Sequence, residues 1–359
     1  MTGRKDPNAM PAVTVLMPVY NAAAHVCEAV DSILSQTFAD FELLVIDDGS
    51  TDETAALLQR YRDPRIRLQR NAENRGLVAT LNGALALARG RYVARMDADD
   101  VSLPSRLQEQ WAYLEAHPEV DGVSAGYETV DAQGRRLRVD YGLLRPVGPT
   151  LLRWSLHFGS FFCHPACMLR REVFTSTGGY DPDFAHAEDY ELWLRATTRF
   201  RLDNLPRVLL RLRVHGENVS ETHRAAQKRN ASRALSRSIA GLLGEPVPLD
   251  HAAILRDAVA PATVADAVAV GALLDRLCRA FVSDPEMTRR DRRLVRADAA
   301  TRLAALAIAV GRRWPAAAAR IALVGCRLSP LAFGRSALAV VRGGTNAWHR
   351  SPIFVEAGP

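Results

Sequence analysis

The first hundred residues alternate short apolar, β-branched runs with segments of helical periodicity. The apolar runs predict strands at 13–17, 41–46, 65–69 and 92–96. Helical spacing of apolar residues predicts intervening helices at 25–36 and 77–88. Strand–helix–strand alternation with short links predicts an α/β fold, with a mostly parallel sheet flanked by helices. Polar clusters follow three of these strands, namely Tyr20-Asn21, Asp47-Asp48 and Asp97 to Asp100. Because ligands bind at the carboxyl ends of parallel strands, the clusters predict a site at one edge of the sheet.

The third cluster contains three carboxylates, at Asp97, Asp99 and Asp100. Carboxylates crowded at a strand end repel one another unless a cation neutralises them. Mg²⁺ and Mn²⁺ take oxygen ligands, commonly one or two carboxylates together with substrate phosphates. The alternative for this cluster alone is a solvated acidic turn before a helix that starts near Pro104. The three carboxylates alone therefore do not decide between a metal site and a turn. Together with the polar clusters at the other strand ends, they favour a divalent metal.

The other strand ends each allow two interpretations. Asp48 could accept hydrogen bonds from a base or a ribose, or it could belong to a turn in which Ser50 or Thr51 caps the next helix. Tyr20 could stack on a base or be an ordinary loop aromatic. Five arginines lie between residues 61 and 76, and we expect one or two of them, Arg75 among the candidates, to meet a diphosphate.

A glycine turn at 178–179 leads into Glu188-Asp189, which starts a predicted helix. Carboxylates are favoured at a helix N-terminus by the helix dipole, and one of them could also act as a general base. His215 lies in a polar loop and could ligate metal or phosphate, although a lone histidine there is more often neither. Cys163, His164 and Cys167 form too small a set for structural zinc, so we expect buried cysteines.

Composition narrows the class of protein. Of the 359 residues, 48% are apolar and 24% charged, as in a globular protein with room for about two domains. The net charge of +6 is unevenly distributed, because residues 1–220 carry 25 basic and 29 acidic side chains and residues 221–359 carry 21 and 11. The acidic first part argues against a nucleic-acid binder. No apolar run is long and uninterrupted enough to predict a membrane span.

Taken in order, the motifs resemble those of the family 2 glycosyltransferases, which have the GT-A nucleotide-diphospho-sugar fold. The resemblance covers about residues 11–220 and rests on an ordered set of short segments. The segments are 15–21, 32–37, 42–52, 74–76, 79–82, 96–100, 104–107 and 188–189. The family's membrane-bound synthases carry spanning helices and a Gln-x-x-Arg-Trp signature, which this sequence lacks, so a processive polysaccharide synthase is not expected.

The resemblance implies roles for the residues that match. Donor binding would involve Pro18, Tyr20, Asn21, Asp48, Arg75 and Asp97, with Tyr20 near the base and Asp97 near the ribose or sugar. Asp99 would coordinate Mg²⁺ or Mn²⁺, with Asp100 and His215 as further ligands. Asp189 matches the family's general base and Glu188 lies beside it. His164, Arg170 and Trp193 would lie on the acceptor side.

The implied activity is inverting, metal-dependent transfer of a sugar from a nucleotide-diphospho-sugar, most commonly a UDP-sugar. The acceptor would be a glycan or a lipid-linked molecule in cell-surface polysaccharide or glycoconjugate biosynthesis. One rival is a nucleotidyltransferase, but no glycine-rich phosphate loop follows the first strand. Another is an inactive family member that acts as a scaffold, although such a protein would be expected to have lost one of these carboxylates.

Three regions are predicted, namely a flexible N-terminus at 1–10, a GT-A domain at 11–222 and a helical region at 223–359. Helices are expected in the last region at 225–243, 250–260, 264–281, 289–312 and 315–328. Their apolar faces alternate with arginine, which suits a cap that packs on the catalytic domain or, as the alternative, a peripheral contact with anionic membrane. We expect a cytoplasmic location, with the inner face of the cell membrane as the candidate lipid surface.

Overall fold

The chain passes from one structural unit to another and back before it reaches the C-terminal helices. A computed structural model describes residues 10–137, 144–214, 223–257, 259–341 and 354–356. The first unit comprises residues up to 143 together with 162–224, and the second comprises 144–161 and 225–356. The prediction from sequence instead grouped all of 11–222 together.

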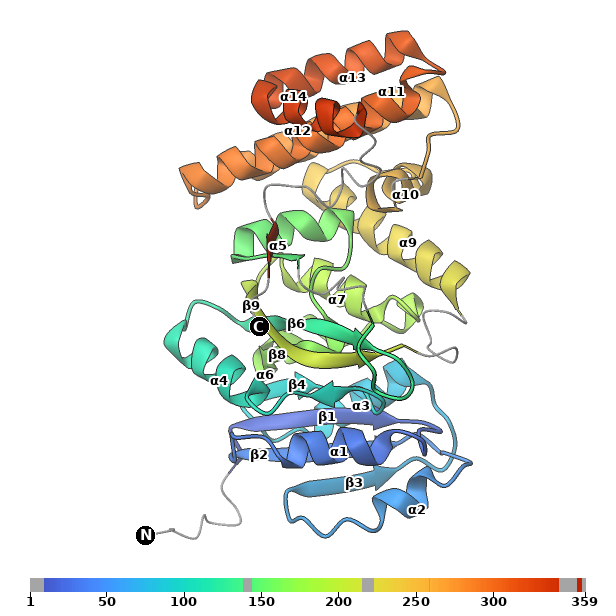
Figure 1. Cartoon of the computed structure of the whole chain (residues 1–359), viewed down its shortest axis with the longest axis vertical. Helices are drawn as coiled ribbons and strands as arrows, with labels where there is room; N and C mark the ends of the chain where they lie inside the picture. Colours follow the sequence, from blue (N-terminus) through green and yellow to red (C-terminus); the bar gives the residue numbers. More distant parts are fainter. Residues whose placement is uncertain (1–9, 138–143, 215–222, 258, 342–353, 357–359) are drawn as a thin grey trace. The chain divides into compact units, whose positions relative to one another are not determined.

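The first unit is built on an eight-stranded sheet with the strand order β3-β2-β1-β4-β8-β6-β9-β5. Its strands are β1 (Val13–Val19), β2 (Phe41–Asp47), β3 (Ile66–Arg70), β4 (Tyr92–Arg95), β5 (Val101–Ser102), β6 (Gly122–Val130), β8 (Met168–Arg170) and β9 (Leu202–Arg213). Strands β3, β2, β1 and β4 run parallel, as the alternation with helices predicted, and Figure 1 shows them in this order. Strand β8 is antiparallel to both β4 and β6, so the complete sheet is mixed.

Helices cover both faces of the parallel strands. The helices of this unit are α1 (Val26–Leu34), α2 (Thr54–Leu58), α3 (Leu77–Leu87), α4 (Arg106–Ala116), α6 (Arg171–Thr177) and α7 (Glu188–Ala196). Every residue of β1 and β2 is buried, because side chains that alternate in direction meet a helix on either side. Val15 and Met17 share a core with Val30 and Ile33 of α1, whereas α3 contacts the same strands and buries Leu81.

The turn after β2 differs from its prediction. Helix α2 begins only at Thr54, and neither Ser50 nor Thr51 caps it. The Ser50 hydroxyl instead accepts a hydrogen bond from the Asn21 amide at 3.0 Å, and the Thr51 amide donates to the Asn21 side chain at 2.8 Å. These bonds join the turns that follow β1 and β2, which places two of the polar clusters side by side.

The second unit is mainly helical. Its elements are β7 (Leu144–Pro146), α5 (Pro149–Ser155), α9 (Arg224–Leu243), α10 (Leu249–Asp257), α11 (Val264–Val282), α12 (Arg289–Gly311), α13 (Pro315–Leu328), α14 (Pro330–Val341) and β10 (Phe354–Glu356). The five predicted helices are present within a few residues of their expected bounds. Helix α14 was missed, because Pro330 was interpreted as a break whereas it is the first residue of that helix, a position that needs no amide hydrogen. Helices α11 to α14 pack against one another (Figure 1).

A buried polar cluster explains why residues 144–161 belong to this second unit. The Trp154 indole on α5 donates to Asp298 on α12 at 2.6 Å, and Arg302 pairs with the same carboxylate at 2.7 Å. The Arg302 guanidinium lies 3.7 Å from the ring centre of Phe158, and Phe281 of α11 contacts Trp154 edge to face. A buried carboxylate is stabilised only when charge and hydrogen bonds surround it, and both are present here.

Candidate active site

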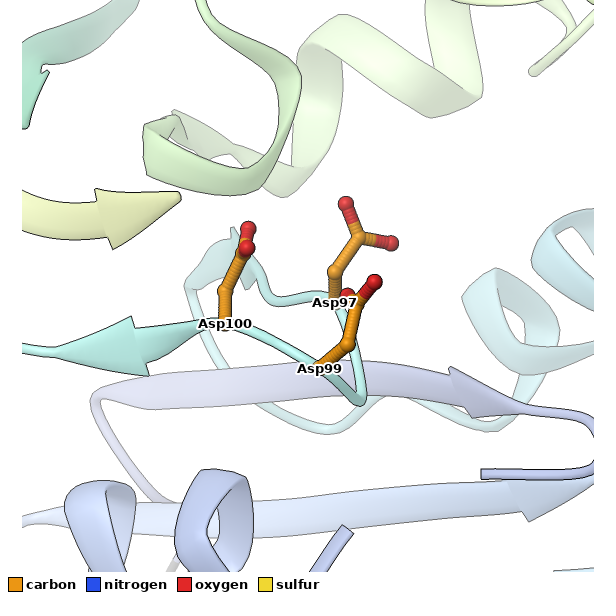
Figure 2. A group of neighbouring side chains, drawn as sticks. All are labelled: Asp97, Asp99 and Asp100. Carbon is orange, nitrogen blue, oxygen red and sulfur yellow. The ribbon is translucent and has the colours of Figure 1, made fainter. Parts of the chain in front are cut away.

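Three carboxylates lie together in the loop after β4. One oxygen from each of Asp97, Asp99 and Asp100 lies within 4.8 Å of the other two. Figure 2 shows the three side chains on the same side of the loop. The loop begins at a defined point, because β4 is hydrogen-bonded to β1 on one side and β8 on the other. The fold therefore brings together, at the carboxyl end of a central strand, the acidic residues that the sequence singled out.

Asp100 is the buried member of this cluster, with 2% of its surface exposed. Its Oδ1 accepts a hydrogen bond from the Arg213 amide at 2.8 Å, and its Oδ2 has no hydrogen-bond partner among the described residues. Burial, together with the charges of Asp97 and Asp99, raises the pKa of Asp100 well above its ordinary value. A divalent cation bound between the three carboxylates would offset both effects, so this set of oxygen donors fits Mg²⁺ or Mn²⁺.

Arg213, the last residue of β9, holds the backbone of the acidic loop. Its Nε donates to the carbonyl of Asp99 at 2.7 Å, and its Nη1 donates to the carbonyls of Asp131 and Ala132 at 3.2 and 3.0 Å. Its Nη2 pairs with Glu28 of α1 at 2.6 Å, and only 1% of the Arg213 side chain is exposed. The sequence analysis assigned this residue no role. In the sequence it is one of several charged residues in this strand, and nothing local sets it apart from the exposed Arg207.

A second buried arginine, Arg95, links the acidic loop to the start of α7. It forms an ion pair with Asp97, which raises the pKa of the guanidinium above its ordinary value although burial opposes the charge. Its charge also acts on Asp100, Glu188 and His164. Arg95 was not predicted as a site residue. In the sequence, Arg95 stands out only as the one charged residue of the predicted strand at 92–96.

Asp48 follows β2 and organises the loop at 71–76. Its Oδ1 accepts hydrogen bonds from the Asn71 side chain at 2.6 Å and the Arg75 amide at 3.1 Å. Its Oδ2 accepts from the Gly76 amide at 3.0 Å, and Gly76 adopts a positive φ of 84°. The Arg75 side chain is exposed. Asp48 thus holds in place the loop that presents Arg75.

Pro18, Tyr20 and Asn21 lie at the carboxyl end of β1. Pro18 is buried in the strand, whereas Tyr20 is 47% exposed directly after it. Asn21 adopts a left-handed φ of 48°, which asparagine tolerates better than most residues, and its side chain binds the turn after β2. The strand ends of β1 and β2 therefore share one hydrogen-bonded edge, with an exposed aromatic ring on it.

Glu188 and Asp189 start α7, as the sequence predicted. Glu188 is 6% exposed, and burial followed by the Asp189 charge raises the pKa of Glu188 to about 7. Asp189 is more exposed, and its Oδ1 accepts from the Tyr190 amide at 2.7 Å. The preceding turn is held by Asn82 of α3, whose side chain bonds both the amide and the carbonyl of Tyr180, at 2.9 and 2.8 Å.

His164 lies under this turn. Its Nε2 is 2.8 Å from the Tyr180 hydroxyl, and its ring meets that of Trp193 edge to face at 5.8 Å. Burial, aided by the nearby Arg95 charge, lowers the pKa of His164 well below its ordinary value, so the ring is neutral. Trp193 is fully buried, and among the described residues its indole nitrogen has no hydrogen-bond partner. Both side chains therefore support the start of α7 from within the core.

One predicted site residue, Arg170, lies away from this group. Arg170 pairs in register with Tyr92, at the end of β4 opposite to the acidic loop. Its guanidinium donates to the Tyr92 hydroxyl and to the carbonyls of Val120 and Leu114. His215, the predicted additional metal ligand, lies outside the residues that the structure describes. As expected, Cys163 and Cys167 are buried.

Comparison with known proteins gives a consistent result. Residues 14–178 match the model of Glycosyl transferase family 2. The putative glycosyltransferase EpsE of Bacillus subtilis is 36% identical over 213 residues, which cover 57% of this chain and 74% of that protein. The O-antigen biosynthesis glycosyltransferase WbnJ of Escherichia coli is 32% identical over 216 residues, which cover 58% of this chain and 82% of that protein.

Solved structures share the fold. TarS of S. aureus, residues 1–349 in complex with UDP-GlcNAc, matches with a TM-score of 0.55 and 16% identity over 92% of each chain. The mannosyltransferase PcManGT of Pyrobaculum calidifontis, in complex with GDP-Man and Mn²⁺, matches with a TM-score of 0.51 and 23% identity over 93% of this chain and 88% of that one. These likenesses confirm the expected GT-A type of fold.

Proposed function

Because the chain belongs to glycosyl transferase family 2, we propose that it transfers a sugar from a nucleotide-diphospho-sugar to an acceptor hydroxyl, with inversion at C1 and with Mg²⁺ or Mn²⁺ as cofactor. The observation that carries this proposal is the group of three carboxylates at the carboxyl end of β4. A diphosphate and a carboxylate cluster repel each other unless a cation lies between them, so this arrangement suits a metal-bound diphosphate.

In this proposal, the donor lies along the ends of β1, β2 and β4. The exposed ring of Tyr20 offers a stacking surface for the base, and Asp48 bonds the base or the ribose while it orders the loop of Arg75. Pro18 and Asn21 shape the same edge, and Asp97 lies toward the ribose or the sugar. The structural relatives were solved with UDP-GlcNAc and with GDP-Man, and we propose a UDP-sugar for this chain.

Asp99 and Asp100 would hold the cation, with Asp97 beside them and His215 as a further proposed ligand. The cation would supply Lewis-acid stabilisation of the charge that develops on the leaving diphosphate. Within the chain, Arg213 fixes the backbone at Asp99 and Asp100, and Arg95 neutralises Asp97. These residues hold the carboxylates in place before the donor arrives, which lowers the cost of assembling the site.

We assign the general base to Asp189. Its carboxylate would take the proton from the acceptor hydroxyl, whose oxygen then bonds to C1 as the bond from C1 to the diphosphate oxygen breaks. Asp189 fits this role better than Glu188, because Asp189 is partly exposed whereas Glu188 is buried and holds its proton up to about pH 7. The acceptor would be a glycan or a lipid-linked molecule of cell-surface polysaccharide or glycoconjugate synthesis, with His164 and Trp193 supporting its side of the site.

Two other functions are less well supported. A nucleotidyltransferase would need a glycine-rich loop for a triphosphate after β1, where this chain has Tyr20 and Asn21 instead. An inactive scaffold would not need Asp100, a carboxyl group whose pKa is raised by burial and by two neighbouring carboxylates. None of the described helices has the length and apolar character required to cross a membrane.

A donor screen and two matched substitutions test the proposal. We expect one nucleotide sugar to raise the melting temperature only with Mn²⁺ or Mg²⁺, since a ligand that binds the folded state stabilises it. Asp99→Asn should abolish both this stabilisation and product formation, measured by mass spectrometry of a glycan acceptor. Asp189→Asn should abolish product but keep the stabilisation, and Asp183→Asn, an exposed change near the same helix, should leave both intact. Wild-type turnover in Asp189→Asn would contradict its assignment as base.

A further inference from the structure

The second unit contains a cavity lined by arginines, separate from the carboxylates of the first unit. It has a volume of about 300 Å³ and lies between α11, α12 and α13. Its lining residues are Asp275, Cys278, Arg279, Val282, Arg296, Arg327 and Leu328. Cys278 is fully buried, and the side chains of Arg279, Arg296 and Arg327 are exposed. A cavity of this size falls at the lower end of the range for small-molecule sites.

The charges of the lining do not balance. Asp275 is the one acidic residue of the lining, and it pairs with Arg279 at 2.8 Å. Within the part of the chain that the structure describes, neither Arg296 nor Arg327 forms an ion pair or a hydrogen bond. No aspartate or glutamate occurs between Asp298 and Glu356, so α13 and α14 provide no carboxylate that could turn toward them. Two guanidinium groups therefore line one cavity in which the single carboxylate is already paired with a third arginine.

Helix electrostatics explain only part of this arrangement. Helices α11 and α13 end at the cavity, and a cation in the last turn of a helix is favoured by the helix dipole. This accounts for Arg279 and Arg327. It does not account for Arg296, which lies in the amino-terminal half of α12, where the dipole gives a cation no stabilisation.

We propose that this cavity binds a phosphate group, either of a free phosphate compound or of a lipid headgroup. The lining carries three arginines and one aspartate, so a phosphate dianion would balance its charge. Arginine binds phosphate oxygens through paired N–H donors, and two unpaired guanidinium groups at one cavity are suited to such a ligand. Val282 and Leu328 provide apolar walls, and Leu323, one helical turn before Arg327 on α13, is also exposed, so the surroundings suit a phosphate with an apolar substituent.

Paired double substitutions in the full chain test this site. Arg296→Gln/Arg327→Gln removes the two unpaired charges of the cavity, and Arg320→Gln/Arg335→Gln removes two exposed arginines of α13 and α14 outside its lining. Binding of pyrophosphate is measured by calorimetry in EDTA, which keeps metal from the carboxylates. Co-sedimentation is measured with phosphatidylcholine vesicles, with and without phosphatidic acid. Stabilisation by donor and Mn²⁺ reports separately on the proposed activity and should be the same in both variants.

We expect the cavity variant to lose about tenfold or more in affinity, because it removes two charged donors to the phosphate oxygens. The outer variant should lose much less. Selective loss of pyrophosphate binding identifies a free phosphate ligand, and selective loss of vesicle binding identifies a lipid headgroup. No binding of either probe to the unsubstituted chain would overturn the proposal. Equal loss in the two variants would also overturn it, because a diffuse surface charge would then explain the binding.

Discussion

Replacing Arg213 by glutamine should weaken metal binding although Arg213 is not a proposed ligand. The guanidinium bonds the carbonyl of Asp99 at 2.7 Å and two carbonyls of the loop at 131–132, and it pairs with Glu28. The Glu28 pair contributes little, because Glu28 is 56% exposed and such pairs give about 0–1 kcal/mol. The bonds to the three carbonyls contribute more, since a hydrogen bond from a charged donor gives roughly 1.5–3 kcal/mol.

Losing these bonds releases the backbone that aims Asp99 and Asp100 at a common point. Residues that orient metal ligands typically change metal affinity by about 10–100-fold when they are replaced, and we expect a loss in this range. Free Mn²⁺ can be counted directly by electron paramagnetic resonance during a titration of the protein. The matched control is Arg211→Gln on the same strand, because Arg211 is half exposed and pairs with Glu128 at the surface.

Measuring stability together with Mn²⁺ affinity distinguishes a change in the orientation of the metal ligands from unfolding of the protein. Circular dichroism and urea unfolding show whether Arg213→Gln remains folded. A folded variant that binds Mn²⁺ as tightly as the Arg211→Gln control would refute the reasoning, since the acidic loop would then keep its geometry without the guanidinium. A folded variant with weak Mn²⁺ binding and normal affinity for the metal-free nucleotide would support it.

Three further substitutions test other parts of the structure. Burial raises the pKa of Glu188 to about 7 from an ordinary 4.5, so protonation of Glu188 stabilises the folded chain at low pH. The free energy of unfolding should therefore fall by up to about 3 kcal/mol between pH 5 and pH 8. Glu188→Gln should abolish this fall in urea titrations. Gly179→Ala should destabilise the fold by about 1–3 kcal/mol in the same assay, because φ is 75° and the new Cβ would lie 2.5 Å from Asn82 Oδ1. Asp298→Ala should cost about 3–5 kcal/mol, seen as a lower urea midpoint, because it removes the carboxylate that pairs with the buried Arg302.

Secondary structure was predicted best where the local pattern of apolar residues is enough to determine the element. The runs at 13–17 and 41–46 are strands because their apolar, β-branched side chains are buried on both faces of a parallel sheet. The acidic cluster after β4 was predictable because the carboxyl end of a strand leads directly into it. Arginine at 95 and at 213 could not be assigned, since a charge in a strand is equally consistent with an exposed edge, and only the tertiary structure buries it.

The organisation of the second unit was harder to predict for a related reason. Nothing local to residues 144–161 indicates that their apolar side chains pack on helices more than a hundred residues later. The proline at 330 illustrates the same limit, because proline begins some helices and ends others, and neighbours decide which. Local patterns thus predicted the elements, whereas their grouping depends on contacts between distant segments.

The hydrogen bond between Trp154 and Asp298 has a consequence for the synthesis of the chain. The two residues are 144 positions apart, so a ribosome adds Asp298 roughly 7–30 s after it adds Trp154. During that interval Trp154 of α5 and Phe158, three residues after its end, lack the partners that bury them and are exposed to chaperones or to aggregation. A shortened protein that ends near residue 224 would present them permanently. Isolating the catalytic unit would therefore require excising residues 144–161 as well as the C-terminal helices.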